Sequence, residues 1–565
     1  MQFSFASRLS LLVGSAVALP TLFACLDHPL KPVEYEAAQE KQDSIALTIN
    51  KDVDILFVID NSGSMGEEQG TLAGNFASFI NVLEADSVKA NYRIGVTTSD
   101  NGNPWCTGTT PEGGKLRLTS CRSRQAEFVF DGAQAVDATQ EACLDECKYE
   151  SIVIEGTTTE LDDTPTPRPW LESIEGATNL GAGVCAAGET DCDPDNPTAV
   201  EAFQCFGPQG INGCGFEQQL ESMYKSLKIN EVEGEPAYGF IRQSAIMAIV
   251  HVTDEADCSY NGEHESIFLP EGDRTFWSLP MEGAPTSAVC WNAGVRCEDG
   301  DCSSANLGVT GDDVSESDAV MRPVSRYVDL VQAYEDAKQL ISPTQEVLVA
   351  LIAGVGDDGS VTYQDSLDQT FQDNFGIGPG CDAASAGTGV PPVRLREFAE
   401  AFQVGDETNM FSICATDYSA ALGAIAAAIA DQVRPACMPA CVADTDETTE
   451  ALDPSCNLVQ EAPQTDGSII ETTIPQCNGD DDFPSDDNNV CYIALVDGAR
   501  DATDEREFFT EDNDADDLSD FCADLGWNLE FTLNRREGFP APGGTSVKAT
   551  CELSQSKVVD CPQLN

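Results

Sequence analysis

The segment VDILFVIDNSGSM, from Val53 to Met65, determines the fold that we expect for this chain. Its continuous apolar run, residues 55–59, is typical of a strand buried on both faces of a parallel sheet. The run passes directly into Asp60 and a short turn that contains glycine and serine. After the turn, apolar side chains recur at helical spacing and predict an amphipathic helix; they are Leu72, Phe76, Phe79, Ile80 and Leu83.

The same alternation of apolar runs and amphipathic segments continues along the chain. Further buried strands are predicted at 92–98, 245–253, 347–355 and 410–415. Helices are predicted at 216–227 and around the apolar positions of 327–337, 395–402 and 418–433. Alternating strands and helices predict an α/β fold with a doubly wound, mainly parallel sheet.

Long stretches rich in Gly, Pro, Asp and Cys separate these elements, at about 101–210, 256–320 and 356–390. Loops of that length are unusual inside a compact domain, but disulfides could hold insertions that lack a large core of their own. We therefore expect one domain over 52–435 with three insertions. After it, residues 436–565 contain eight cysteines and a very acidic segment at 501–520, and they predict a small, Cys-rich, mostly β C-terminal domain.

The charge balance restricts the partners of this 565-residue chain. It carries 97 acidic and 29 basic side chains, a formal net charge of −68. Binding to nucleic acid needs clustered Lys and Arg, so the composition argues against it, and it disfavours anionic membrane surfaces for the same reason. Divalent cations are natural companions of so many carboxylates.

The N-terminus predicts export. Residues 1–24 form a short apolar segment with a single basic residue, and they end in Leu22-Phe23-Ala24-Cys25. This tetrapeptide resembles a bacterial lipobox, which implies a signal peptide over 1–24 and a lipid on Cys25; an ordinary secretory signal is the alternative. Residues 25–51 would be a tether. Leu26 is not the Asp that retains enterobacterial lipoproteins in the inner membrane, so we expect the outer membrane, on either its periplasmic or its surface face.

Cysteine parity supports an oxidising compartment. Setting Cys25 aside leaves 22 of the 23 cysteines, an even number, with 14 of them between Cys106 and Cys414 and eight between Cys437 and Cys561. Exported chains commonly form disulfides. We therefore predict disulfide pairing within each block and leave the connectivity open.

A metal site is predicted where the first strand ends. Asp60, Ser62 and Ser64 place three hard oxygen donors in one tight loop, and such donors suit Mg²⁺. Ligands of open α/β sheets bind beyond the carboxyl ends of the strands. The alternative is a serine-rich turn that merely begins the helix.

This D-x-S-x-S motif, with the apolar strand before it, resembles the metal-ion-dependent adhesion site of a von Willebrand factor A (VWA) domain. The resemblance covers about 52–433 and, with the segments VTDEADCS and GCGFE, is similar to large VWA lipoproteins of bacterial envelopes. It implies a second aspartate after a later strand, which here is Asp254; the alternative for Asp254 is a solvated turn acid. It also implies a Thr or Ser from a third loop.

That third loop, 210–217, contains neither Thr nor Ser. Asn212 or Glu217 could supply the missing oxygen. The departure from the family pattern leaves three alternatives: weaker binding, a preference for Ca²⁺ or Mn²⁺ over Mg²⁺, or a site that has lost its metal.

The function that the resemblance implies is adhesion rather than catalysis. An envelope lipoprotein would bind a protein ligand, whose Asp or Glu completes the metal coordination. Two alternatives remain: a structural envelope protein with a vestigial metal site, and a metal-dependent hydrolase with Glu255, Asp257 or Glu217 as general base. We assign no catalytic residue, and we expect His251, inside an apolar strand, to be a core histidine with its hydrogen bonds satisfied.

Overall fold

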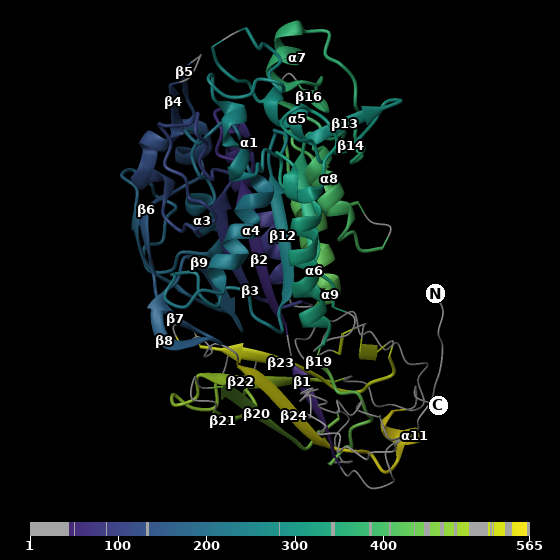
Figure 1. The fold of residues 1–565 in the computed structure, drawn as a ribbon. Coiled ribbons are helices and arrows are strands. Elements are labelled where there is room, and N and C mark those ends of the chain that lie inside the picture. Colours follow the sequence, from purple (N-terminus) through teal and green to yellow (C-terminus); the bar gives the residue numbers. More distant parts are fainter. Residues whose placement is uncertain are drawn as a thin grey trace, which may run out of the picture. The chain divides into compact units, whose positions relative to one another are not determined.

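The protein is described here from a computed structural model (Figure 1). The structure describes residues 44–49, 51–85, 88–131, 135–281, 283–340, 345–383, 387–405, 408–433, 436–445, 452–463, 468–478, 483–496, 518–519, 522–523, 525–536, 539 and 545–561. The predicted signal peptide, Cys25 and most of the acidic segment 501–520 lie outside these residues.

The core of the fold is a mostly parallel sheet, as the sequence predicts, and in the described residues it has seven strands where five were predicted. Its strand order is β10-β9-β3-β2-β12-β15-β18. Five strands run parallel: β3 (Asn91–Thr98), β2 (Asp52–Ile59), β12 (Ile246–Val252), β15 (Leu348–Ala353) and β18 (Met410–Ser412). The sequence analysis missed two strands at one edge, β9 (Trp170–Ile174) and β10 (Ala177–Thr178), because they lie within the first insertion; β9 is antiparallel to β3.

Helices bury both faces of β2, which explains its continuous apolar run. Ile55, Phe57 and Ile59 belong to one apolar cluster, and Leu56 and Val58 belong to another. The first cluster includes α1 (Gly66–Asn75), α2 (Ala77–Leu83), α3 (Ala199–Phe206) and α9 (Ser419–Gln432). The second includes α4 (Gln219–Asn230), α6 (Ser325–Gln339) and α8 (Val393–Glu400).

Two predicted helices differ from the structure in their bounds. The helix expected after the metal-site turn is two short helices, α1 and α2, which meet at Phe76. The helix expected from residue 216 begins at Gln219. Residues 217 and 218 stay outside it because their backbone groups bond to other loops: Cys258 N donates to Glu217 O at 2.7 Å, and Gln218 N donates to Ser99 O at 2.9 Å.

Eleven disulfides hold the insertions and the C-terminal region, and the predicted pairing within two blocks is confirmed. In the first block, Cys106–Cys214, Cys121–Cys143, Cys147–Cys205 and Cys185–Cys192 hold the first insertion, Cys258–Cys290 and Cys297–Cys302 the second, and Cys381–Cys414 the third. In the second block the pairs are Cys437–Cys522, Cys441–Cys561, Cys456–Cys551 and Cys477–Cys491. Because disulfides persist in oxidising compartments, they indicate an extracellular or envelope protein.

The insertions have short elements of their own. The first contains η1 (Cys121–Phe128), β4 (Val129–Asp131), β5 (Ala135–Asp137), η2 (Gln140–Leu144), β6 (Tyr149–Ile154), β7 (Gly156–Thr159), β8 (Asp162–Pro167) and β11 (Leu180–Cys185). The second contains η3 (Gly262–Phe268), α5 (Ala288–Gly294), β13 (Val295–Glu298), β14 (Asp301–Ser304) and η4 (Glu316–Asp318). The third contains α7 (Gln369–Phe375), β16 (Cys381–Ala383) and β17 (Gly387–Gly389).

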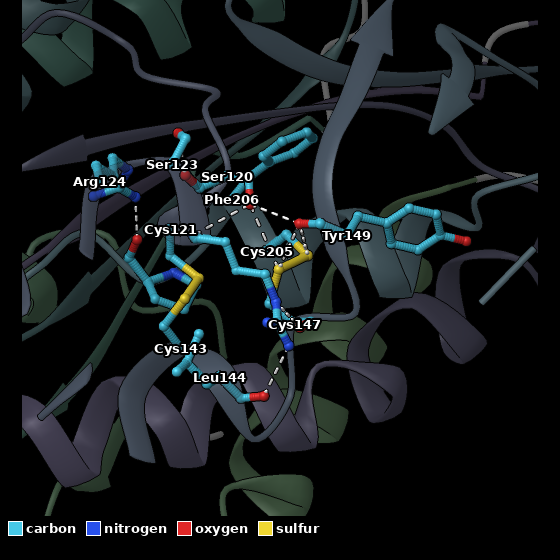
Figure 2. Close-up of a disulfide and its surroundings, with 12 residues drawn as sticks. Ser120, Cys121, Ser123, Arg124, Cys143, Leu144, Cys147, Tyr149, Cys205 and Phe206 are labelled. Atoms are coloured by element: carbon cyan, nitrogen blue, oxygen red, sulfur yellow. Dashed lines mark hydrogen bonds between the residues drawn. A yellow bond between two sulfur atoms is a disulfide. The ribbon is translucent and has the colours of Figure 1, made fainter. Parts of the chain in front are cut away.

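Two neighbouring disulfides link η1, η2 and α3 in the first insertion (Figure 2). Cys121–Cys143 joins η1 to η2, and Cys147–Cys205 joins the segment after η2 to α3. The Ser120 hydroxyl donates to the carbonyl of Tyr149 at 2.9 Å beside them. All four sulfur-bearing residues are buried, so these cross-links take the place of part of an apolar core.

The C-terminal region is mostly β, as predicted. It contains β19 (Ala436–Cys437), β20 (Cys456–Pro463), β21 (Ile469–Ile474), β22 (Val490–Leu495), β23 (Glu530–Arg535), β24 (Ser546–Glu552) and the short helix α11 (Lys557–Asp560). One sheet has the order β19-β23-β22 and the other β1-β24-β20-β21.

Part of the predicted tether is a strand of the C-terminal sheet. Residues 44–49 form β1 (Ser44–Ile49), which pairs antiparallel with β24 from Ser44 opposite Glu552 to Ile49 opposite Val547. The partner strand lies near the other end of the chain, so no local pattern could show this pairing. Separately, none of the helices in the described ranges combines the length and the apolar character that a bilayer span requires.

We predict that the disulfide Cys147–Cys205, which closes a long loop, contributes more stability than Cys297–Cys302, which closes a short one. Replacing Cys147 and Cys205 together by Ala removes a cross-link of sequence separation 58, and the chain-entropy model gives about 4 kcal/mol for such a loop. The matched control, Cys297→Ala with Cys302→Ala, removes a cross-link between residues only 5 positions apart. For this short loop the chain-entropy model gives about 2 kcal/mol. Urea unfolding followed by fluorescence measures both, and equal losses would contradict the prediction.

Candidate metal site at the carboxyl end of the central sheet

Three adjacent parallel strands end at the predicted site. Asp60 follows β2, Ser99 follows β3, and Thr253 and Asp254 follow β12. The ladder continues into these residues: Asp60 N donates to Val252 O at 2.9 Å. The sheet therefore brings together Asp60 and Asp254, which the sequence predicted, with Ser99 and Thr253, which it missed. Asp60 was predicted from the D-x-S-x-S motif and Asp254 from the resemblance to VWA domains. Ser99 directly follows a predicted strand and could have been found by its position, whereas Thr253 was predicted to lie inside its strand.

Asp60 is fully buried, and three donors orient its carboxylate. Oδ1 accepts from Ser62 N at 2.8 Å and from the Ser99 hydroxyl at 3.3 Å. Oδ2 accepts from the Thr253 hydroxyl at 2.6 Å. Burial raises the pKa of Asp60 above its ordinary value although these hydrogen bonds oppose the rise. The carboxylate is thus fixed in direction, and no basic side chain in the described ranges forms an ion pair with it.

The two serines of the motif, Ser62 and Ser64, lie between the buried Asp60 carboxylate and the protein surface. The hydroxyl oxygens of Ser62 and Ser64 are 3.2 Å apart. Ser62 is buried, whereas Ser64 is exposed. The loop therefore presents its hydroxyls side by side, with solvent access from the Ser64 side.

Gln69, which no motif marked, ties this loop to the third loop. Its Nε2 donates to the carbonyl of Asp60 at 2.8 Å and to that of Gly210 at 2.7 Å. In return, Gln209 N donates to Gln69 Oε1 at 2.7 Å. Gly213 N also donates to Asn61 O at 2.8 Å, and a Cβ at Gly213 would lie 2.3 Å from Asn61 Oδ1. Glycine therefore permits the close approach of the two loops.

Within the third loop, the structure distinguishes the two candidate residues. Asn212 is exposed. Glu217 is 1% exposed, and burial raises its pKa well above the ordinary value, with further contributions from the charges of Glu255, Asp60 and Asp254. Glu217 thus lies with the other acids, and Asn212 faces solvent.

Asp254 is a buried acid rather than a solvated turn residue, with 6% of its surface exposed. Burial, and then the charge of Asp60, raises its pKa to about 7, against a hydrogen bond from the Ser64 side chain. Glu68 of α1 shares this environment: burial, and next the charge of Asp254, raises its pKa to about 8. Burial, and then the charges of Asp254 and Asp60, also raises the pKa of Glu255 well above its ordinary value.

Buried oxygen acceptors without a hydrogen-bond donor gather at this end of the sheet. In the described part of the chain they include Asn61 Oδ1, Glu217 Oε1, Gln219 Oε1 and Asp254 Oδ1. Buried polar atoms are normally paired, and buried charges are costly unless they are paired or coordinate a metal. The donor set therefore fits a hard cation, which would interact with acceptors that the protein itself leaves unpaired.

The acids are not arranged as an all-carboxylate cage. Among the described residues, no group of three or more His, Cys, Asp or Glu side chains is placed to hold a metal ion. A cation here would depend on the hydroxyls of Ser62 and Ser64 and on water as well as on carboxylates, as the D-x-S-x-S motif implies.

Two other predicted residues have different surroundings. Asp257, a candidate general base, accepts from Arg394 Nε at 2.9 Å and from the Ser259 hydroxyl at 2.6 Å. Because Arg394 belongs to α8, this ion pair holds the loop that follows β12 against α8. His251 is a core residue, as expected, but its hydrogen bonds are not satisfied. Neither ring nitrogen has a partner in the described residues, because the ring points into the apolar layer beside Phe398. Burial lowers its pKa to about 3, so it stays neutral.

We predict that the metal-free protein loses stability as the pH rises from about 5 to about 8. The folded state keeps protons on Asp254 and Glu68, whose pKa values are raised to about 7 and about 8, whereas the unfolded chain releases them near pH 4. The unfolding midpoint measured in EDTA should therefore decrease as the pH is raised from about 5 to about 8. Asp254→Asn should make the fall shallower, and a midpoint that is flat or rises with pH in the wild type would refute the prediction.

Comparisons with known proteins give little. No protein-family model matches the chain, and no curated protein matches it. Among solved structures it is similar to the pilus adhesin SpaC from Lactobacillus rhamnosus GG in its open conformation, with 8% identity, a TM-score of 0.28, and coverage of 90% of this chain and 40% of that chain. Another crystal structure of the same adhesin gives 8% identity and a TM-score of 0.27 over the same shares. The chain thus spans less than half of that adhesin, and a likeness at this TM-score carries no argument.

Proposed function

We propose that residues 52–435 form a VWA-type domain that binds a protein ligand through a divalent metal ion. The observation that carries the proposal is the group of buried, unpaired oxygen acceptors around Asp60 and Asp254. The strand order, with Asp60 after the central strand β2 and Asp254 after its neighbour β12, supports it. The N-terminal lipobox supports an envelope lipoprotein anchored through Cys25, in the outer membrane.

In this proposal Asp60, Ser62, Ser64 and Asp254 hold the ion directly or through water, and Glu217 takes the place of the missing third-loop hydroxyl. Mg²⁺ is our first candidate, with Mn²⁺ and Ca²⁺ as alternatives. The bound ion supplies positive charge at one point of a strongly acidic chain. Thr253 and Ser99 fix the direction of the Asp60 carboxylate, and Gln69 keeps the third loop against the motif.

A partner's Asp or Glu would complete the coordination from the exposed, Ser64 side of the loop. Without the ion, the net charge of −68 would repel such a carboxylate. Association should therefore require the metal and depend on ionic strength.

Calorimetric titration of Mg²⁺, Mn²⁺ and Ca²⁺ into residues 26–565, which keep every described residue, tests the metal site. We expect saturable binding of one of these ions, its loss in Asp254→Asn, and weaker binding in Glu217→Gln. Asn212→Ala is the matched control in the same loop and should bind as the wild type does. Identical titrations of the wild type and Asp254→Asn would overturn the proposal.

The ligand class can be tested with an array of synthetic peptides, each with a central Asp or Glu, beside the same peptides with Asn or Gln. We expect the wild type to bind acid-containing peptides in the presence of the metal, and binding to disappear in EDTA or in Asp254→Asn. Equal binding to the amide-containing peptides would show that a carboxylate is not what the site recognises.

A further inference from the structure

A cavity of about 450 Å³ lies beside the candidate metal site. Its walls come from α1, from the π-helical turn η2 and the residues after it, and from the segment that leads into α9. Glu68 connects the cavity with the candidate metal site. It lines the cavity, and the charges of Asp254 and Asp60 contribute to its raised pKa. The lining residues are Glu67, Glu68, Gly70, Thr71, Gly74, Asn75, Glu141, Asp145, Glu146, Ala415, Thr416 and Tyr418.

The cavity is lined by five carboxylates. No basic side chain is among its described lining residues, and none of the five acids forms an ion pair within the described part of the chain. Two of them accept weak or local hydrogen bonds, Asp145 from Gln140 and Glu146 from Gln204. The four lining acids other than Glu68 thus concentrate negative charge at the cavity, and no basic side chain in the described part of the chain pairs with them.

Glu68 is the second observation that points to a ligand. Its side chain is 5% exposed, and Oε2 has no hydrogen-bond partner in the described residues. Without a cation beside it, burial favours the protonated form of Glu68, because a buried carboxylate oxygen without a donor is costly. A cationic group within the cavity would supply the missing donor.

The walls are held in place by close packing and cross-links. A Cβ at Gly70 of α1 would lie 2.5 Å from the carbonyl oxygen of Glu141, so only glycine lets η2 approach α1 this closely. The buried pairs Cys121–Cys143 and Cys147–Cys205 cross-link η2 and the residues after it to η1 and α3 (Figure 2). The acids of both walls are therefore arranged before any ligand arrives, which lowers the entropy cost of binding.

We propose that this cavity receives a basic side chain, Lys or Arg, of the same protein partner whose carboxylate meets the metal. The proposal rests on the proposed function. An extended organic cation fits better than a second bare metal ion, because the cavity has a volume of about 450 Å³ and combines carboxylates with apolar lining surface. The carboxylates can accept charge-assisted hydrogen bonds from the ammonium or guanidinium group, and Ala415 and Tyr418 offer apolar surface to its aliphatic stem.

Binding of N-acetyl-arginine amide to residues 26–565 in EDTA, measured by calorimetry or NMR at physiological ionic strength, tests the cavity apart from the metal. The neutral isostere N-acetyl-citrulline amide should bind about tenfold more weakly, since it lacks the charge. The triple variant Glu141→Gln/Asp145→Asn/Glu146→Gln should weaken arginine-amide binding by about tenfold. These three residues are not among the proposed metal ligands.

The matched control changes the net charge equally on another part of the surface. Glu150→Gln/Asp191→Asn/Asp195→Asn replaces three exposed acids and should leave arginine-amide binding as in the wild type. Equal weakening in the two triple variants, or equal binding of arginine and citrulline amides, would overturn the proposal. So would loss of an Mg²⁺ or Ca²⁺ binding event in the cavity variant, because that result would assign the cavity to a metal.

The two proposals fail in different ways. If Asp254→Asn leaves metal titrations unchanged while the cavity variant loses arginine-amide binding, the metal-dependent function fails and the cationic cavity stands as a separate site. If metal binding disappears in Asp254→Asn and arginine amide does not bind, the metal site stands and the cavity proposal fails.

Discussion

The burial of β2 on both faces is the constraint on which the candidate site depends. Alternate side chains of this strand enter two different apolar clusters, one covered by α1, α2, α3 and α9 and the other by α4, α6 and α8. A one-residue slip of the strand would move each set of side chains into the wrong layer. The register that burial enforces therefore fixes the position of Asp60, and it places the neighbouring strand ends of β3 and β12 beside it.

The candidate site contains buried acids, whose burial is unfavourable and must be offset by the stability of the rest of the fold. Asp60, Asp254, Glu217, Glu68 and Glu255 are buried, and burial raises the pKa of each of them. Several other buried acids in the described part of the chain are ion-paired, for example Asp257 with Arg394 and Asp54 with Arg242. The contrast sets the acids at the carboxyl end of the sheet apart from the structural ion pairs, and unpaired buried charge is characteristic of functional sites.

The insertions contribute residues and cross-links to the candidate site and to the cavity beside it. The first supplies one wall of the acidic cavity, and Cys106–Cys214 anchors the third loop beside Asp100, whose Oδ2 accepts from Cys214 N at 3.2 Å. Disulfides add cross-links to the apolar contacts that hold the insertions in place. A chain with so many acids can thereby hold several of them close together in fixed positions.

The sequence by itself determined the features that depend on local pattern. Apolar runs gave the parallel strands, helical spacing gave the helices that cover them, and cysteine parity gave pairing within two blocks. The D-x-S-x-S motif gave Asp60, and the resemblance to VWA domains that this motif carries implied Asp254. Only the tertiary structure decided what depends on distant contacts: Glu217 rather than Asn212 beside the acids, Gln69 between two loops, and β1 paired with β24. The physical reason is that these contacts join residues far apart in the chain, such as Asp60 and Thr253 at a separation of 193, and periodicity carries no information about which distant backbone will approach.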